Sequence, residues 1–444
     1  MYMVEITDYQ ILQRDPTGYA MGIFCGDIPA EYNERGRVYA RAVREDDGLT
    51  IVGWKLCQIE KGIWRTEMHL PEGGLYRLEA SWCEGETSPE WALRVKTIHY
   101  IGVGDLFMLT GQSNMAGYGR DAAYDPPQLG VHLYGNNGRW NVAAHPLNDS
   151  VGTIYPENAE YTSSTSPALA FGRRLMERLG IPIGLIQASR GSSALTEWHP
   201  EEDGSLYRAM LRRLDVVGPI KGVLWYQGCS DANATDANRY LERYARMVEL
   251  WRDRIGKVPF LTVQLNRRTT VGELEESHRY WGLICEAQRQ AARQIPDVYV
   301  VPSLDLPVTD GIHNSSGANV IIGERLANTA LQGIYGKSGQ LAPSVSAVEY
   351  VDEMHVYVGF PSDFCMTTID EVGDDMNLED VDGLISCVRA TNWKNGFLVT
   401  AARPIQLPAR FYALWRCCPP AFVPRDKHGM PMLACYGVDV KVPH

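Results

Sequence analysis

The chain has 444 residues, a length that suggests two or three domains rather than one core. Its hydrophobic content of 45% and charged content of 22% are those of an ordinary globular protein. A net charge of −12 argues against a protein that binds nucleic acid through a basic surface, and no segment reaches the roughly 20 apolar residues of a membrane helix. We therefore expect no nucleic-acid partner and no membrane insertion.

The N-terminal residues lack a basic segment followed by an apolar core, which is the pattern of a signal peptide. We expect a cytoplasmic protein, with secretion allowed if a leader has been removed. The ten cysteines are predicted to be free thiols of a reducing compartment, because several stand inside apolar runs. No C-x-x-C pair occurs and the histidines are dispersed, so we expect no metal site.

Residues 1–100 are predicted to form an all-β, sandwich-like domain. Apolar and polar side chains alternate strictly over 76–82 and more loosely over 38–42, which is typical of strands with one buried face. Asp46-Asp47-Gly48 and Glu72-Gly73-Gly74 are turn signals between such runs.

Residues 101–338 change character, because strand-like runs now alternate with helical patterns. Ser166 followed by Pro167 predicts the start of one helix, and apolar residues recur at helical spacing over 240–255. This alternation indicates a parallel sheet covered by helices on both faces, a three-layer α/β/α core. The predicted strands lie at 105–110, 181–186, 222–226, 260–265 and 298–301.

Residues 339–444 return to short strand-like runs, for example 354–358 and 411–415. We expect a C-terminal β-rich domain.

The strongest functional signal is Gly111-Gln112-Ser113-Asn114-Met115, directly after the run 105–110. A strand that ends in Gly presents the next hydroxyl at the carboxyl edge of the sheet, where α/β proteins bind ligands. Downstream, Asp310 precedes His313 by three residues, so its carboxylate can hold one imidazole nitrogen while the other takes a proton from a serine. The sequence thus predicts a triad of Ser113, His313 and Asp310.

Two further segments follow predicted strands and supply candidate donors for an oxyanion. Gly191 can offer an unobstructed N–H and Gln227 a side-chain amide, beside the N–H of Ser113 itself. Four nearby side chains are candidate substrate contacts, although Trp198 could equally be a packing residue: Gln112, Asn114, Arg190 and Trp198.

These motifs resemble those of the SGNH (GDSL-like) hydrolase superfamily, and most of all bacterial sialate O-acetylesterase-like carbohydrate esterases. The resemblance implies an SGNH core between two β-domains, with Ser113 as nucleophile, Gly191 and Gln227 in the oxyanion hole, and Asp310 and His313 completing the triad. It departs at Cys229, where the family usually has Glu. The segments that carry it are 104–115, 189–198, 225–228 and 310–313.

We expect from this a serine esterase that removes O-acetyl groups from a sugar or oligosaccharide without a cofactor. Sialic acid, xylose, mannose and glucose units all stay open as the acetylated sugar, and so does the oligomeric state. The alternative is a non-catalytic carbohydrate-binding protein that retains the fold.

Overall fold

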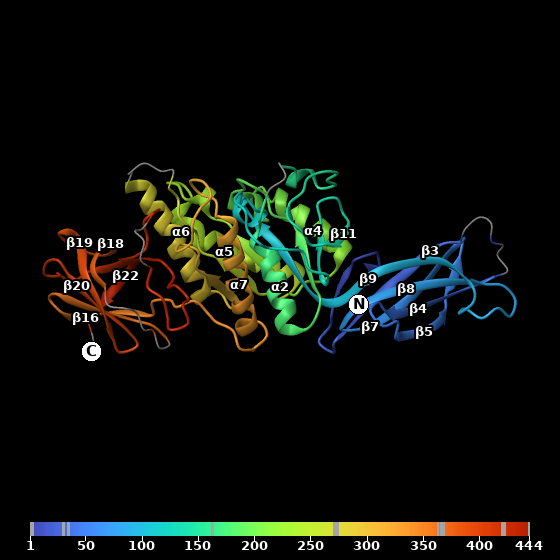
Figure 1. The fold of residues 1–444 in the computed structure, drawn as a ribbon. Coiled ribbons are helices and arrows are strands. Elements are labelled where there is room, and N and C mark those ends of the chain that lie inside the picture. Colours follow the sequence, from blue (N-terminus) through green and yellow to red (C-terminus); the bar gives the residue numbers. More distant parts are fainter. Residues whose placement is uncertain are drawn as a thin grey trace.

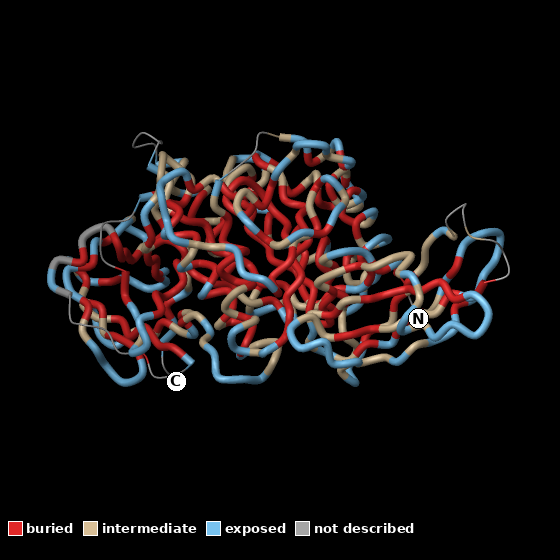
Figure 2. The backbone as a smooth tube through the Cα atoms, turned by 45° about the vertical axis from the view of Figure 1, so that its right-hand side comes forward, coloured by how far each residue is buried: buried red, intermediate tan, exposed pale blue. Residues whose placement is uncertain are grey.

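The computed structural model describes residues 4–28, 32, 36–160, 164–269, 275–361, 364, 369–418 and 423–442. An α/β part lies in the middle of an elongated molecule, with N-terminal strands at one end and C-terminal strands at the other (Figure 1). The most continuous burial is in this middle part (Figure 2).

The N-terminal strands form two sheets whose apolar side chains meet between them. One sheet has the order β1-β3-β7-β6, and in the other β4 pairs with β5 and β8. Phe24 and Trp64 of the first sheet and Val38 and Leu78 of the second belong to one buried cluster, as the alternation in the sequence predicts. The strands are β1 (Val4–Glu5), β2 (Ile11–Gln13), β3 (Tyr19–Asp27), β4 (Arg37–Arg44), β5 (Thr50–Leu56), β6 (Gln58–Glu60), β7 (Ile63–Pro71) and β8 (Gly73–Cys83).

Strand β9 (Leu93–Gly111) joins the N-terminal part to the α/β part without a break. Its first half pairs with β8, and its second half pairs with β12 and β13 in the central sheet. The domain boundary that the sequence suggests, after residue 100, falls inside this strand. At the crossing point Asp105 is only 1% exposed, and its carboxylate accepts a hydrogen bond of 2.8 Å from Arg14 Nη2.

The central sheet has the order β11-β10-β12-β9-β13-β14-β15, and all its neighbouring strands except β11 run parallel. The predicted strands at 181–186, 222–226, 260–265 and 298–301 are confirmed within a few residues at their ends. The strands are β10 (Val131–Tyr134), β11 (Trp140–Val142), β12 (Ile183–Gln187), β13 (Gly222–Tyr226), β14 (Phe260–Val263) and β15 (Val298–Val301).

Helices lie on both sides of this sheet. Alternate side chains of β9 therefore enter two different buried clusters, one on each side. Leu106 and Met108 pack with α4 (Ser205–Val217), α5 (Tyr240–Ile255) and α6 (Glu275–Gln294). Phe107 and Leu109 pack with α2 (Pro167–Leu179) and α7 (Ser316–Gly333). The predicted start of α2 is confirmed, since the Ser166 side chain accepts the N–H of Ala168 at 3.3 Å.

The C-terminal strands close into a barrel that packs on α6. The side-chain amide of Gln264, after β14, bonds both the N–H of Ala434 at 2.9 Å and its carbonyl at 3.0 Å. The barrel consists of β16 (Ala347–Asp352), β17 (His355–Gly359), β18 (Ile369–Asp380), β19 (Gly383–Trp393), β20 (Gly396–Ala401), β21 (Arg410–Ala413) and β22 (Cys435–Lys441).

The nine described cysteines are free thiols, and six of them are buried. Cys365 lies outside the described residues. In the described part of the chain, no helix combines the length and apolar character needed to cross a bilayer.

A buried histidine attaches the N-terminal segment to the central sheet. His132 in β10 donates from Nδ1 to the carbonyl of Tyr9 at 2.6 Å, while Nε2 accepts the N–H of Gly130 at 3.2 Å. Because Nε2 is an acceptor inside the core, the ring must stay neutral. Burial lowers the pKa of His132 from 6.5 to about 4, although the bond to Tyr9 opposes that shift.

We expect the free energy of unfolding to fall by about 3 kcal/mol between pH 6.5 and pH 4 on account of His132. Between these two pH values His132 is protonated in the unfolded chain but stays neutral in the folded chain. The contribution of His132 to the free energy of unfolding is therefore greatest above pH 6.5. The measurement is urea unfolding at several pH values for the wild type and His132→Gln, whose amide offers one donor and one acceptor and does not titrate. His428→Gln, at an exposed position, is the matched control. An unchanged pH slope in His132→Gln would show that this ring does not carry the effect.

Candidate active site

Ser113 follows a sharp turn at the carboxyl end of β9. Gly111 has a φ of 115°, and a Cβ there would lie 2.3 Å from the carbonyl oxygen of Tyr226 on the neighbouring strand β13. Only glycine therefore lets the chain leave the sheet at this point. The serine is the first residue of α1 (Ser113–Ala116) and is 8% exposed.

Ser113, His313 and Asp310 lie in hydrogen-bonding contact, as the sequence predicts. His313 Nε2 is 2.9 Å from Ser113 Oγ across 200 residues of sequence, and Nδ1 is 2.8 Å from Asp310 Oδ2. Because an ionised carboxylate only accepts, Nδ1 carries the ring hydrogen and Nε2 is free to accept the serine proton. This is the arrangement of a nucleophile, a general base and a group that orients the base.

The Asp310 carboxylate is held ionised by its own loop. Its Oδ1 accepts the backbone N–H groups of Ile312 and His313, both at 2.9 Å. Burial alone raises the pKa of Asp310, but the hydrogen bonds from the His313 ring and from these two N–H groups outweigh it and lower the pKa to about 2.

Asn114 holds the loop that carries His313. Its Oδ1 accepts the N–H of Asn314 at 2.9 Å, and its Nδ2 donates to the carbonyl of Ile312 at 3.3 Å, so one amide contacts the backbone on both sides of the histidine. Asn266, from the segment after β14, adds a bond of 2.8 Å to the same carbonyl. In this structure the Asn114 amide is engaged with this loop and the residue is 1% exposed, so its role as a substrate contact stays a prediction.

Gln112 likewise connects two loops. Its side-chain oxygen accepts the N–H groups of Gly228 and Cys229, both at 3.0 Å, and the residue is almost fully buried. Gln112 thus fixes the turn after β13 against the turn after β9, and its role as a substrate contact stays a prediction.

The two predicted oxyanion donors outside Ser113 are both engaged in this structure. The Gly191 N–H donates to Glu160 Oε2 at 2.7 Å. The Gln227 amide nitrogen donates to Asp231 Oδ2 at 2.5 Å and to the carbonyl of Ser193 at 3.2 Å. Since an amide has two hydrogens and both are used here, Gln227 offers no free donor in this structure, and its role in the oxyanion hole stays a prediction.

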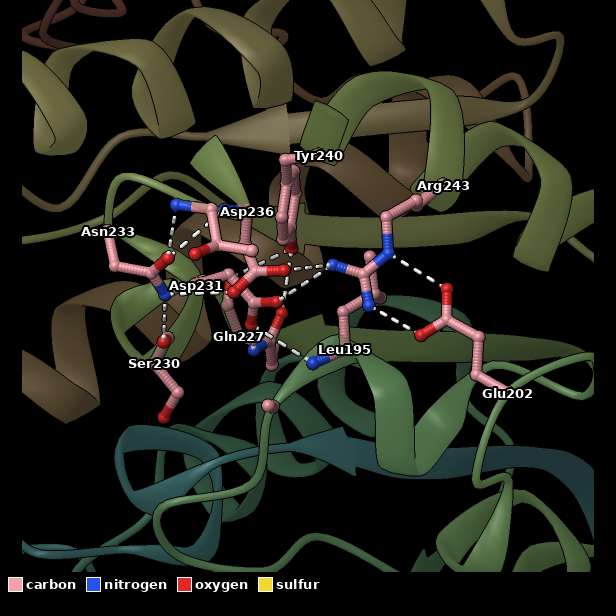
Figure 3. A network of polar contacts seen from close by, with 12 residues as sticks. Leu195, Glu202, Gln227, Ser230, Asp231, Asn233, Asp236, Tyr240 and Arg243 are labelled. Atoms are coloured by element: carbon pink, nitrogen blue, oxygen red, sulfur yellow. Dashed lines mark hydrogen bonds and ion pairs between the residues drawn. The ribbon is translucent and has the colours of Figure 1, made fainter. Parts of the chain in front are cut away.

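Gln227 belongs instead to a buried polar network behind the site (Figure 3). Its oxygen accepts from Tyr240 Oη at 2.9 Å, and its nitrogen contacts Asp231. Asp231 also accepts the N–H of Leu195 at 3.0 Å and lies 3.4 Å from Arg243 Nη1. Burial raises the pKa of the Asp231 carboxyl group, although its contacts with Gln227, Leu195 and Arg243 act in the opposite direction. The network fixes the loop after β12, the turn after β13 and the start of α5 relative to one another.

Trp198 and Arg190, the other two predicted substrate contacts, differ in exposure. Trp198 ends α3 (Leu195–Trp198), is 0% exposed and packs on Trp225 and Trp251 with ring centroids 5.7 and 6.1 Å away. It packs as a core residue in this structure, and its substrate role stays a prediction. The Arg190 side chain forms an ion pair of 3.2 Å with Glu197. It is 36% exposed, so solvent still reaches it.

Cys229 lies in a short 3-10 turn, Cys229–Asp231, directly after Gly228. Burial raises the pKa of its thiol to about 12, so it is protonated at neutral pH and is no nucleophile. Among the described residues, no three His, Cys, Asp or Glu side chains gather closely enough to hold a metal ion.

Glu160, Tyr118 and Asn266 contact the site but were missed in the sequence. Glu160 follows the turn Pro156–Asn158, and the Tyr118 ring stacks on His313 with centroids 4.7 Å apart. None of them belongs to a motif with diagnostic spacing. The single local signal is that Tyr118 comes soon after Ser113, on the same loop that leaves the sheet.

Comparison with known proteins found a matching family model, a relative and a similar solved structure. A family model described as "Carbohydrate esterase, sialic acid-specific acetylesterase" matches residues 103–332, which include the triad. A probable carbohydrate esterase of Arabidopsis thaliana is 27% identical over 255 residues, covering 52% of this chain and 92% of that protein. The solved structure of a carbohydrate acetylesterase from Xanthomonas citri matches with a TM-score of 0.66 at 21% identity over 98% of both chains. The last match shows that the fold is shared along nearly the whole chain, flanking β parts included.

We expect Asn114→Ala to lower kcat by about 10- to 100-fold while KM changes little, because the His313 loop loses its support but the substrate loses no contact. The measurement is steady-state hydrolysis of p-nitrophenyl acetate. Asn137→Ala, at an exposed turn, is the control. Asn114→Asp keeps the acceptor for the Asn314 N–H and should recover part of kcat. A raised KM with unchanged kcat would instead place Asn114 in contact with substrate.

Proposed function

The chain belongs to the carbohydrate esterase family of sialic acid-specific acetylesterases, and we propose that it removes O-acetyl groups from a carbohydrate through a Ser-His-Asp acyl-enzyme mechanism. The observation that carries the proposal is the 2.9 Å contact between Ser113 Oγ and His313 Nε2, with Asp310 on the other ring nitrogen. All three residues lie within the part of the chain that the family model matches.

In the first half-reaction, His313 Nε2 takes the Ser113 proton as Oγ attacks the carbonyl carbon of the acetyl ester. Asp310 stabilises the imidazolium that forms and keeps the ring oriented. His313 then gives the proton to the departing sugar oxygen as the tetrahedral intermediate collapses to an acetyl-serine.

In the second half-reaction, His313 takes a proton from water, and the water oxygen attacks the acetyl carbonyl. Collapse of this second intermediate returns the proton to Ser113 Oγ and releases acetate. The backbone N–H groups of Ser113 and Gly191 are the donors that we assign to the anionic oxygen of both intermediates. This proposal leaves Gln227 out of the oxyanion hole, because Asp231 and Ser193 hold its amide.

We assign the central part to the three-layer SGNH type of core. One support is the parallel sheet. The other is that Leu106 and Phe107 of β9 belong to two different buried clusters, each of which includes side chains of helices. Arg190 is a partly exposed cation near the site, and we assign it to any acidic group of the sugar. The assembled triad favours an enzyme over a non-catalytic carbohydrate-binding protein.

We expect Ser113→Ala and His313→Ala each to lower kcat by about 10³-fold or more, and Asp310→Asn by a similar or smaller factor. Because the three groups act as a unit, the double variant Ser113→Ala/His313→Ala should lose little more than either single variant. The measurement is release of acetate from acetylated sialic acid and acetylated xylo-oligosaccharides, beside hydrolysis of p-nitrophenyl acetate.

The chain offers a matched control in its barrel. Asp352 and His355 have the same spacing and the same contact, 2.8 Å from Oδ1 to Nδ1, on an exposed turn. Asp352→Asn and His355→Ala should leave kcat unchanged. A folded Ser113→Ala variant with near wild-type turnover would overturn the proposed mechanism.

A further inference from the structure

The carboxylate of Glu160 lies beside the triad, although the mechanism above does not use it. Its Oε2 accepts the Gly191 N–H at 2.7 Å and a longer bond of 3.4 Å from Tyr118 Oη, and its Oε1 accepts from the side-chain amide of Asn148. The ring of Tyr118 stacks on His313. A single aromatic side chain therefore separates this carboxylate from the proposed general base.

The space directly over Gly191 is filled by this carboxylate. A Cβ on Gly191 would lie 2.5 Å from Glu160 Oε2 and 3.0 Å from Tyr118 Oη. The distance of 2.7 Å from Gly191 N to Glu160 Oε2 lies at the short end of the range for N–H···O hydrogen bonds. A carboxylate oxygen thus occupies the N–H that the proposed mechanism gives to the oxyanion.

The carboxylate and the oxyanion cannot both occupy this donor. A backbone N–H makes one strong hydrogen bond, and two negative oxygens brought together at one donor repel each other. Either Gly191 does not serve the reaction, or Glu160 gives up the bond when the ester binds.

We propose that Glu160 is a positioning residue of the esterase site, whose carboxylate holds the Gly191 N–H in the free enzyme and yields it to the acyl oxygen of the bound ester. The inference rests on the proposed function, because it concerns a donor of that mechanism. It implies that part of the ester's binding energy is used to move Glu160 away.

The surroundings of Glu160 make such a displacement feasible. Burial raises the pKa of its carboxyl group even though the contacts with Gly191, Arg190, Tyr118 and Asn148 act in the opposite direction. The ionised carboxylate of Glu160 is therefore less stable in this position than it would be in water. The neighbouring Arg190 is partly exposed and offers a cation toward which the released carboxylate can turn.

The test uses a boronic acid, which adds to the serine hydroxyl as a tetrahedral anion and needs the same donors as the reaction intermediate. The inhibition constant of benzeneboronic acid is measured for the full-length wild type, Glu160→Gln and Glu160→Ala, together with kcat and KM for p-nitrophenyl acetate. Glu157→Gln is the matched control, because Glu157 lies three residues earlier and pairs with Arg212 at 2.6 Å. Thermal unfolding of each variant shows whether it is folded.

We expect both Glu160 variants to bind the boronate about tenfold more tightly than the wild type and to show a lower KM, because no anion competes for the Gly191 N–H. Glu157→Gln should match the wild type. Glu160→Gln keeps the shape of the side chain and remains informative if Glu160→Ala does not fold. Equal or weaker boronate binding by folded Glu160→Gln would overturn the proposal, since the carboxylate would then merely support the loop.

Failure of this inference differs from failure of the proposed function. If the boronate inhibits the wild type, and Ser113→Ala neither binds it nor turns over, the mechanism stands whatever Glu160 does. If the wild type itself is not inhibited and Ser113→Ala is active, the proposed function fails and the role of Glu160 fails with it.

Discussion

The site depends on the close approach of two backbones at the end of β9. Gly111 lies so near the carbonyl of Tyr226 that any side chain would collide with it. This contact forces the chain to turn out of the sheet one residue before the helix that starts at Ser113. Every later element of the site, from the His313 loop to the Gln227 turn, is positioned against this corner.

Amide side chains then fix the loops around that corner. Gln112 holds the turn at 228–229, Asn114 and Asn266 hold the loop of His313, and Gln227 joins Asp231 in the buried network (Figure 3). Each amide offers donors and an acceptor on one rigid plane, so one side chain can satisfy two backbone groups of a foreign loop. Neutral amides thus supply many of the contacts between these loops, beside the charged pair of Asp231 and Arg243 in the buried network.

Much of this could be predicted from the sequence, for reasons visible in particular residues. The strands of the central sheet are short apolar runs, and the helix over 240–255 has a clear period, so both were found. The contacts among Ser113, His313 and Asp310 could be predicted because Ser113 follows a strand directly and Asp310 bonds His313 within one loop. The same Asp-x-x-His spacing at Asp352 and His355 shows that the pattern alone does not specify a site. The contacts that Gln112, Asn114, Gln227 and Trp198 make could not be predicted, because they depend on which distant loop meets each side chain. Glu160 was missed for the same reason.

The buried pair of Arg14 and Asp105 bears on how this protein can be divided or recombined. Asp105 sits in the hydrolase part of β9, almost fully enclosed, and Arg14 comes from the segment after β2. A hydrolase part cut free of the N-terminal strands would lose the hydrogen bonds that Gln13 and Arg14 donate to Asp105 and would keep the one from Tyr335 Oη. The N-terminal strands are therefore not an interchangeable module. A genetic exchange that replaced them would have to bring along an arginine at the same place, so this pair restricts which chimeras can fold.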